Sequence, residues 1–342
     1  YGTPGDENNV VKKLFQQMIL LFKLHKLVKN VSPNAIFSFL EKSNLLTICV
    51  PTRKVKKIVS VHNVLSIQYK KIHNSIVRKL VYAMIKRAYN RCKNVVAVSK
   101  QVKDDLVANF GVKEDCIRVI NNFVDRDSIQ QKSIESIDDF VFRNDVKYIM
   151  NVGRFSDQKA QWKLIKAFSL YEKRATIPVE LILIGAGEHT KKLKELIDDL
   201  GLMGKAHILP FNINPYKYMR KANLFVLSSV YEGFPIVLAE VSSLKIPFVG
   251  SKKSIPEEIF DDKSVWEKVV YENVFTESDF TTYIHSDEVV LSELLKNGIE
   301  NECFRQMIHK HSEKWEEGNL KKHQFGQYNQ LIGLNYEANA RS

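Results

Sequence analysis

Residues 148–187 read YIMNVGRFSDQKAQWKLIKAFSLYEKRATIPVELILIGAG, and this stretch decides the fold class. The apolar runs at 148–152 and 180–184 have the length of buried strands, and residues 162–171 between them carry apolar side chains at helical spacing. A strand, a helix and a second strand joined by short connections predict a βαβ unit with two parallel strands. The chain is therefore expected to be an α/β protein.

The same alternation of strand and helix continues on both sides of this unit. Downstream, the pattern predicts helices and strands in turn over residues 190–200, 206–209, 216–222 and 224–227. Upstream, apolar runs with amphipathic segments between them predict buried strands at residues 35–40, 57–61 and 94–98. This order predicts two successive Rossmann-like, doubly wound domains.

A stretch without a clear period separates the two series. Residues 121–145 are rich in Asp, Ser, Gln and Asn, and we interpret residues 126–145 as the interdomain connection. The N-terminal domain is then expected at residues 1–125, and the C-terminal domain, including helices in its charged tail, at residues 146–342. Because the chain opens with a polar segment and a helical pattern, the first domain is expected to lack its opening strands.

Residues 76–88 form an amphipathic pattern in the first domain. Its apolar side chains recur at helical spacing: Ile76, Val77, Leu80, Val81, Met84, Ile85 and Ala88. Lys79, Lys86 and Lys93 are spaced seven residues apart on another face. We therefore expect a helix that packs by its apolar side and shows a basic side to solvent.

Positive charge is concentrated in the first part of the chain. Residues 1–103 hold 20 Lys and Arg against 3 Asp and Glu, a net charge of +17, whereas the rest holds 31 against 36, or −5. Residues 51–103 contain 14 Lys and Arg and no acid. Unless it is merely solvated, such a surface suits the anionic face of a membrane or a nucleic-acid backbone. Nucleic acid is not expected, because the basic run has neither interleaved aromatic residues nor the motif of a known module.

The loop that follows the strand at 148–152 is a candidate phosphate site. It reads GRFSDQK at residues 153–159 and enters the next helix just afterwards. Gly153 permits close approach of a diphosphate, Arg154 can pair with two oxygens, and Lys159 adds a point charge beside the free N–H groups of a helix N-terminus. Taken alone, the same two cations could equally be surface residues at a strand end.

A second candidate loop, SVYEGFPIVLAE at residues 229–240, follows the strand at 224–227. Pro235 suits the first turn of a helix, so Glu232 is expected in the loop and Glu240 about one and a half turns into the helix. A loop carboxylate can accept hydrogen bonds from sugar hydroxyls, and the later one can hold a ribose diol. The N–H groups of Gly233 and Phe234 can meet a phosphate or sugar oxygen. For either acid alone, complementing the helix dipole or simple solvation would suffice.

These two motifs, in this order and spacing, resemble the retaining glycosyltransferases of family four, also called group 1, which have the two-domain glycosyltransferase B (GT-B) fold. The spacing of Glu232 and Glu240, with seven residues between them, is the most specific mark of the resemblance. It extends over residues 58–259 and includes SVHN at 60–63, VAVS at 96–99, INNFVD at 120–125, IGAG at 184–187 and IPEE at 255–258. The glycine usual after the motif lysine is Ala160 here, which is expected to tighten the phosphate loop.

The resemblance implies a role for each matching residue. Arg154 and Lys159 would clamp the donor diphosphate, Glu232 would order the transferred sugar and Glu240 would hold the ribose. His62 would face the donor sugar across a cleft between the two domains. Catalytic roles therefore fall to Glu232, His62, Arg154 and Lys159, and donor binding adds Gly153, Gly185, Gly187, Gly233, Phe234, Pro235 and Glu240. Gly185 and Gly187 either approach the nucleotide or form only a tight turn.

The expected function is transfer of a sugar, with retention, from a nucleotide-diphosphate donor to a glycan or lipid-linked acceptor in polysaccharide, lipopolysaccharide or capsule biosynthesis. A UDP-sugar is expected as the donor, with no metal required and no other cofactor. The basic first domain would dock on the inner face of the cytoplasmic membrane. Two alternatives stay open: a nucleotide-sugar epimerase of the same fold, and a non-catalytic membrane or nucleic-acid binder with a degenerate transferase fold.

Several remaining features predict little chemistry. Four widely spaced cysteines (Cys49, Cys92, Cys116 and Cys303) have no metal-site spacing, which is typical of free thiols in a reducing cytoplasm. Asp125 and Asp127 match an Asp-x-Asp metal pattern but fall at the interdomain connection, so a metal is not expected there. His189 and His207 are interpreted as polar surface or packing residues.

Overall fold

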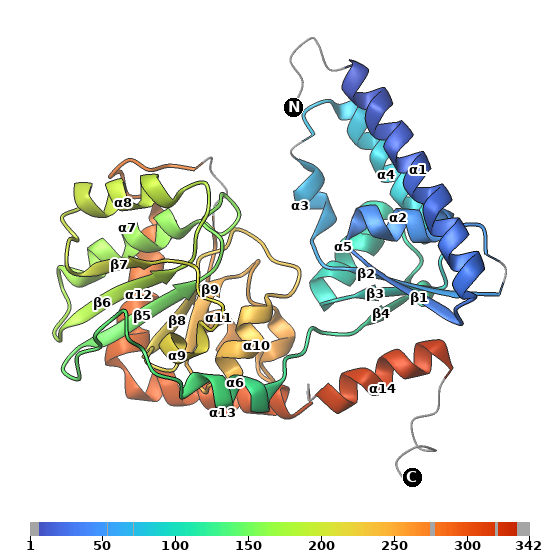
Figure 1. The fold of residues 1–342 in the computed structure, drawn as a ribbon. Helices are drawn as coiled ribbons and strands as arrows, with labels where there is room; N and C mark the ends of the chain where they lie inside the picture. Colours follow the sequence, from blue (N-terminus) through green and yellow to red (C-terminus); the bar gives the residue numbers. More distant parts are fainter. Residues whose placement is uncertain (1–6, 53, 71, 274–277, 319–320, 334–342) are drawn as a thin grey trace, which may run out of the picture. The chain divides into compact units, whose positions relative to one another are not determined.

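The computed structural model describes residues 7–52, 54–70, 72–273, 278–318 and 321–333 of the 342-residue chain (Figure 1). Contacts divide the chain into two compact units. The first unit takes the residues before 122 together with 324–333, and the second takes the residues between them. Within the described residues, no helix is both long and apolar enough to cross a membrane.

The first unit is built on one parallel sheet whose strands lie side by side in chain order. They are β1 (Ala35–Phe39), β2 (Lys56–Val61), β3 (Asn94–Ala97) and β4 (Ile117–Val119). The strands predicted at 35–40, 57–61 and 94–98 are thus confirmed, and β4 was not predicted. The helices of this unit are α1 (Glu7–Val31), α2 (Glu41–Cys49), α3 (Leu65–Lys70), α4 (Ser75–Tyr89), α5 (Lys100–Phe110), the 3-10 turn η1 (Glu114–Cys116) and α14 (Lys321–Ile332).

The last helix, α14, packs on the first unit, although the sequence predicted it in the second domain. Its residues Tyr328, Leu331 and Ile332 pack against a buried cluster of Ile58, Val96 and Ile120 from strands β2 and β3 and the end of β4. The Nζ atom of Lys56 donates a hydrogen bond of 2.8 Å to the carbonyl of Ile332. Burial of this apolar cluster explains why a segment so distant in sequence joins the first sheet.

Helix α4 confirms the helix predicted at 76–88, but only part of its predicted packed side is buried. Of that side the helix buries Ile85 and Ala88, together with Tyr89. Ile76, Val77, Leu80 and Met84 are instead exposed to solvent. A helical period locates an apolar stripe but does not say whether a neighbour covers it.

The second unit contains a six-stranded parallel sheet in the order β10-β9-β8-β5-β6-β7, which is the Rossmann strand order. The strands are β5 (Lys147–Val152), β6 (Val179–Ile184), β7 (Ala206–Leu209), β8 (Leu224–Leu227), β9 (Phe248–Ser251) and β10 (Val270–Tyr271). All register pairs are parallel. The chain order reverses between β5 and β8, so the crevice outside their carboxyl ends is where such a sheet binds ligands.

Helices cover both faces of this sheet (Figure 1). Helix α7 packs against α8 and α12, whereas α10 packs against α6 and α13. Their bounds are α6 (Arg126–Ser133), α7 (Gln161–Glu172), α8 (Thr190–Asp199), α9 (Tyr216–Met219), α10 (Ile236–Ser243), the 3-10 turn η2 (Glu257–Ile259), α11 (Lys263–Val269), α12 (Ser286–Glu300) and α13 (Glu302–Gly318). Helix α6 lies where an irregular connection was expected, and Asp125 caps it by accepting from the N–H of Ser128.

Buried ion pairs join α7 to α12 and to the segment before it. The Nζ of Lys163 lies 2.5 Å from Oδ2 of Asp287, and both side chains are almost fully buried. Lys166, also fully buried, lies 2.7 Å from Asp279 and 3.9 Å from Glu288. Hydrogen bonds from Lys166, Thr281 and His285 outweigh the effect of burial and lower the pKa of Asp279. These pairs hold the helix that follows the first candidate loop.

Candidate active site

The two candidate loops meet at the carboxyl ends of β5 and β8, where the strand order reverses. Three hydrogen bonds join them: Val230 N–H to the carbonyl of Gln158 (2.8 Å), Gln158 Nε2 to the carbonyl of Tyr231 (3.0 Å), and Ser228 Oγ to the carbonyl of Lys159 (2.7 Å). The predicted phosphate loop and the predicted sugar-binding loop are therefore one structural unit.

Lys159 and Glu232, one predicted functional residue from each loop, form an ion pair. Nζ of Lys159 lies 2.6 Å from Oε1 of Glu232, and their side chains are only 26% and 11% exposed. The pair places a cation and a carboxylate side by side, so one can attract a diphosphate while the other accepts hydrogen bonds from sugar hydroxyls. Glu232 is also held through its backbone, because its N–H donates to the carbonyl of Lys253.

Arg154 is exposed, and within the described part of the chain its guanidinium makes no hydrogen bond or ion pair. Its backbone is nevertheless fixed, since Nε2 of Gln161 donates to its carbonyl at 3.1 Å. The same amide reaches Oδ1 of Asn151, whose own amide donates to the carbonyl of Val226 in β8. Arg154 thus stands on an ordered loop with its charge available to an anion.

Ala160 begins α7 in the left-handed conformation. Its φ and ψ are 47° and 43°, and its side chain is fully buried. A non-glycine residue in this region is strained by roughly 1–3 kcal/mol, and such strain is found at ligand-binding loops. The turn directs Lys159 toward Glu232 and leaves the first N–H groups of α7 at the loop, as anion binding at a helix N-terminus requires.

The backbone at Gly185 and Gly187 contacts the backbone of the phosphate loop. A Cβ atom on Gly185 would lie 2.0 Å from the carbonyl oxygen of Gly153, and one on Gly187 would lie 2.2 Å from that of Phe155. Phe155 N–H also donates to the carbonyl of Ala186 at 3.1 Å. These glycines are required because two backbones touch, which neither of the two roles considered from the sequence, approach to the nucleotide or a tight turn, includes.

Glu240 lies on α10 and bonds to a residue that sequence reasoning missed. The hydroxyl of Tyr216 donates to its Oε1 at 2.9 Å. Burial raises the pKa of Glu240, and the Tyr216 hydrogen bond partly offsets this effect. Tyr216 on α9 therefore orients the carboxylate and favours its ionised form. Nothing in the spacing of the sequence links α9 to α10, so only the fold brings the two residues together.

The remaining residues of the second loop are packed rather than open. Gly233, Phe234 and Pro235 are all buried, and Pro235 is the N-cap residue of α10, so the helix begins at Ile236. The amide of Asn122 donates to the carbonyl of Phe234 at 3.0 Å. This packing holds the loop in one conformation.

His62, the one predicted site residue in the first unit, follows β2. Its Nε2 lies 2.9 Å from Oγ of Ser60, and its ring packs edge-on against Phe39 with centroids 5.6 Å apart. Burial lowers the pKa of His62, so the imidazole is neutral near pH 7. A neutral imidazole can donate a hydrogen bond at one nitrogen and accept at the other.

One group of three possible metal ligands occurs among the described residues, at the edge of the phosphate loop. Ligand atoms of Asp157, Glu188 and His189 lie within 4.8 Å of one another. They already pair among themselves, because Nε2 of His189 lies 2.7 Å from Oδ1 of Asp157, which also accepts from Ser278. The sequence did not predict this group, since its members come from two different loops.

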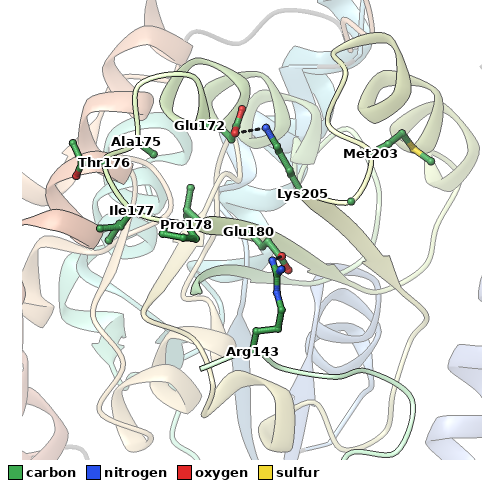
Figure 2. Close-up of a pocket in the computed structure, with 11 residues that line it drawn as sticks. Arg143, Glu172, Ala175, Thr176, Ile177, Pro178, Glu180, Met203 and Lys205 are labelled. Carbon is green, nitrogen blue, oxygen red and sulfur yellow. Dashed lines mark hydrogen bonds and ion pairs between the residues drawn. The ribbon is translucent and has the colours of Figure 1, made fainter. Parts of the chain in front are cut away.

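A hollow of about 570 Å³ lies in the second unit at the opposite, amino-terminal end of β6 and β7 (Figure 2). Its charged side chains are paired, Arg143 with Glu180 and Lys205 with Glu172. His207 also pairs with Glu180, at 3.1 Å. Because ligands of open parallel sheets bind outside the carboxyl ends of the strands, a nucleotide is not expected in this hollow.

Comparisons with known proteins show the family and the fold of the chain. The profile of the family Glycosyl transferases group 1 matches residues 133–286, and that of Glycosyltransferase Family 4 matches residues 4–128. An N-acetylgalactosamine-N,N'-diacetylbacillosaminyl-diphospho-undecaprenol 4-alpha-N-acetylgalactosaminyltransferase of Campylobacter jejuni is 30% identical over 258 residues, which are 74% of this chain and 67% of the relative. An O-antigen chain mannosyltransferase of Salmonella typhimurium is 27% identical over 229 residues, covering 62% and 59%.

Among solved structures, that of Anabaena HepE in complex with UDP is similar, with a TM-score of 0.70 and 17% identity over 92% of this chain and 81% of that one. The chain belongs to the group 1 glycosyltransferases and has the GT-B fold, with two Rossmann-like domains. The predicted membership of the group 1 glycosyltransferases and the predicted fold class are thus confirmed, and the chain is a transferase.

Proposed function

We propose that this transferase moves a sugar from a UDP-sugar to a glycan or lipid-linked acceptor in polysaccharide or lipopolysaccharide assembly. The observation that carries the donor part is the Lys159–Glu232 pair at the junction of two hydrogen-bonded loops. Support for the donor base comes from the similar HepE structure, which holds UDP. Support for the acceptor class comes from the names of the Campylobacter and Salmonella relatives.

In this proposal the protein works by positioning and electrostatic stabilisation. Arg154, Lys159 and the N–H groups at the start of α7 stabilise the diphosphate as it leaves with the electron pair of the glycosidic bond. Glu232 orders the sugar, which becomes oxocarbenium-like as the bond breaks, and Glu240 holds the ribose. His62 of the first unit is a further proposed catalytic residue. We propose that the acceptor hydroxyl oxygen forms the new bond on the face from which the diphosphate leaves, so that configuration is retained without a dedicated protein nucleophile. The hydroxyl proton passes to the departing diphosphate.

Calorimetric titration with UDP, GDP and ADP tests the donor site. We expect the wild-type protein to bind UDP, and Arg154→Ala and Glu240→Ala to lose most of that affinity. Arg174→Ala is the matched control, because Arg174 follows the opposite end of α7 and pairs with Glu293. If the folded wild-type chain binds none of the three nucleotides, the donor proposal is wrong.

Retention and metal independence need a turnover measurement. In a panel of UDP-sugars, slow hydrolysis of the accepted donor should release the sugar first as the anomer present in that donor, as observed by NMR. The rate should be the same with EDTA and in His189→Ala, which removes the only ring from the possible metal group. Release of the opposite anomer would refute retention, and loss of turnover in EDTA would refute metal independence.

We further propose that the enzyme acts in the cytoplasm and docks on the inner face of the membrane, where a lipid-linked acceptor is presented. The support is the net charge of +17 on residues 1–103.

A further inference from the structure

Helix α4 carries an apolar stripe that faces solvent. Ile76, Leu80 and Met84 are spaced by one helical turn and are 69%, 65% and 50% exposed, and Val77 beside them is 45% exposed. The opposite side of the helix is buried through Ile85, Ala88 and Tyr89. The stripe is therefore a continuous outward face and not a set of scattered surface residues.

Basic side chains border this stripe. Lys79, Lys86 and Arg87 are exposed on the same helix, and the last two lie in its final turn. The surrounding stretch, residues 51–103, contains no Asp or Glu. Apolar side chains flanked by cations on one helix face are the composition of helices that lie in the interface of anionic membranes.

The helix is ordered in the protein alone. Oδ1 of Asn74 accepts from the N–H groups of Ile76 and Val77 at 3.0 and 3.2 Å, which caps the first turn. The buried residues fix the other side to the first unit. Binding to a surface therefore need not include the entropic cost of forming the helix.

We propose that α4 is the membrane-binding element of this enzyme: Ile76, Val77, Leu80 and Met84 insert into the interface of an anionic bilayer, and Lys79, Lys86 and Arg87 contact phospholipid headgroups. This inference rests on the membrane docking of the proposed function and names its residues. A second copy of the chain fits less well, because two such basic faces repel. A nucleic-acid backbone is polar and charged, so it has no apolar surface that could cover the aliphatic stripe.

Co-sedimentation with vesicles tests the proposal on the full chain. Two double variants separate its parts: Leu80→Gln/Met84→Gln removes the apolar contact, and Lys79→Gln/Lys86→Gln removes charge. Vesicles of phosphatidylcholine alone are compared with vesicles that also contain phosphatidylglycerol, at low salt and at about 1 M salt, where the Debye length is about 3 Å. Met203→Gln/Ile213→Gln is the matched control, because both residues are exposed apolar residues of the second unit.

At low salt, the wild-type chain and the control should bind the anionic vesicles much more tightly than the neutral ones. The charge variant should lose about tenfold or more of its low-salt affinity. The apolar variant should lose about tenfold or more of its affinity for the anionic vesicles at low salt. It should lose a similar factor of the affinity that remains at about 1 M salt. Equal binding to both vesicles, or an apolar variant that binds like wild type, overturns the proposal. Tighter binding of the wild type to duplex RNA than to anionic vesicles would also overturn it.

Calorimetry with UDP on the same samples keeps this proposal distinct from the transferase proposal. Both α4 variants should bind UDP like wild type, since α4 lies outside the donor loops, and this also shows that they fold. If the wild type binds vesicles but does not bind UDP, the donor site is refuted and the role of α4 is not. Intact UDP binding without any vesicle binding would refute both the membrane docking and the role of α4, and would leave the donor site standing.

Discussion

The second unit buries charge in pairs, whereas the first unit leaves much of its positive charge on the surface. Lys163 and Asp287 are 1% and 3% exposed and lie 2.5 Å apart, and Lys159 and Glu232 pair at the donor loops. In the first unit, residues 51–103 have no acid of their own with which to pair. The second unit thus holds charge in defined pairs, whereas most basic side chains of residues 51–103 are exposed. In the functions proposed above, the second unit positions a substrate and the first unit meets a membrane surface.

The largest effect should come from breaking a buried pair. Lys163→Met leaves the Asp287 carboxylate buried without its cation, which should lower the free energy of unfolding by about 3–5 kcal/mol. The double variant Lys163→Met/Asp287→Leu should recover most of this loss, because apolar residues of similar size replace the pair. Urea unfolding followed by circular dichroism measures both.

The control for this comparison lies in the first unit. Lys103 pairs with Glu114, but the side chains are 25% and 69% exposed. Lys103→Met should therefore change the unfolding free energy by less than about 1 kcal/mol. Equal losses in Lys103→Met and Lys163→Met would remove the contrast between the two units.

The next effect concerns turnover. Lys159→Ala should lower the turnover rate of the UDP-sugar by about 100- to 1000-fold, because it removes a cation from the departing diphosphate. The fold should be unaffected, since this side chain is partly exposed. Glu232→Gln combined with Lys159→Ala should cost less than the product of the single losses, because the two residues act as a pair.

Lys205→Ala is the matched variant, since Lys205 pairs with Glu172 at the other end of the sheet. Its turnover rate should equal that of the wild type. A Lys159→Ala enzyme within about threefold of wild type would show that the loop cation does not act in turnover.

A smaller effect should follow from loss of the Tyr216 hydrogen bond. Tyr216→Phe should weaken UDP binding about tenfold, because Glu240 loses the group that orients it. The hydroxyl lowers the pKa of Glu240 against the raising effect of burial, so its removal should raise that pKa further. As the pH falls, Tyr216→Phe should therefore lose ribose binding at a higher pH than the wild type does.

The pH series needs Glu240→Gln as its reference, because the terminal phosphate of UDP also titrates. Subtracting the pH profile of UDP binding by Glu240→Gln from each other profile leaves the contribution of the Glu240 carboxylate. Profiles of Tyr216→Phe and wild type that coincide after this correction would show that Tyr216 does not act on Glu240.

The smallest effect is expected at Ala160. Replacement by glycine relieves the left-handed strain but removes a buried methyl group and increases the entropy of the unfolded chain. These terms oppose one another, so Ala160→Gly should change the unfolding free energy by less than about 1 kcal/mol. Ala160→Val should be clearly destabilised, because a β-branched residue is strongly disfavoured there. A tenfold drop in UDP affinity in Ala160→Gly would mean that the strained turn serves binding.

The strands that carry the site were predictable because each is a compact apolar run followed by a polar loop. The strands predicted at 206–209 and 224–227 match β7 and β8, and the one predicted at 148–152 starts one residue late. Strands β4 and β10 escaped prediction because two or three residues show no period, and β9 escaped because only Phe248 and Val249 of its four residues are large and apolar. The parallel order of the strands then brings the two loops together, which is why Lys159 and Glu232 were both found.

Other features depend on contacts that no local pattern contains. Tyr216 reaches Glu240 across 24 residues, and α14 reaches Lys56 across 276. The exposed stripe of α4 was mistaken for a packed face because amphipathic period does not specify which surface a helix meets. Gly185 and Gly187 were noticed, but the touching backbones that require them are visible only in the structure.

The return of α14 to the first unit has a consequence for biogenesis. The second unit is one continuous segment, so it can complete its sheet as soon as that segment has left the ribosome. The first unit begins earlier but waits for residues 324–333 before Ile58, Val96 and Ile120 are covered. The unit synthesised first is therefore finished last, and its apolar face is open to chaperones or to aggregation throughout synthesis of the second.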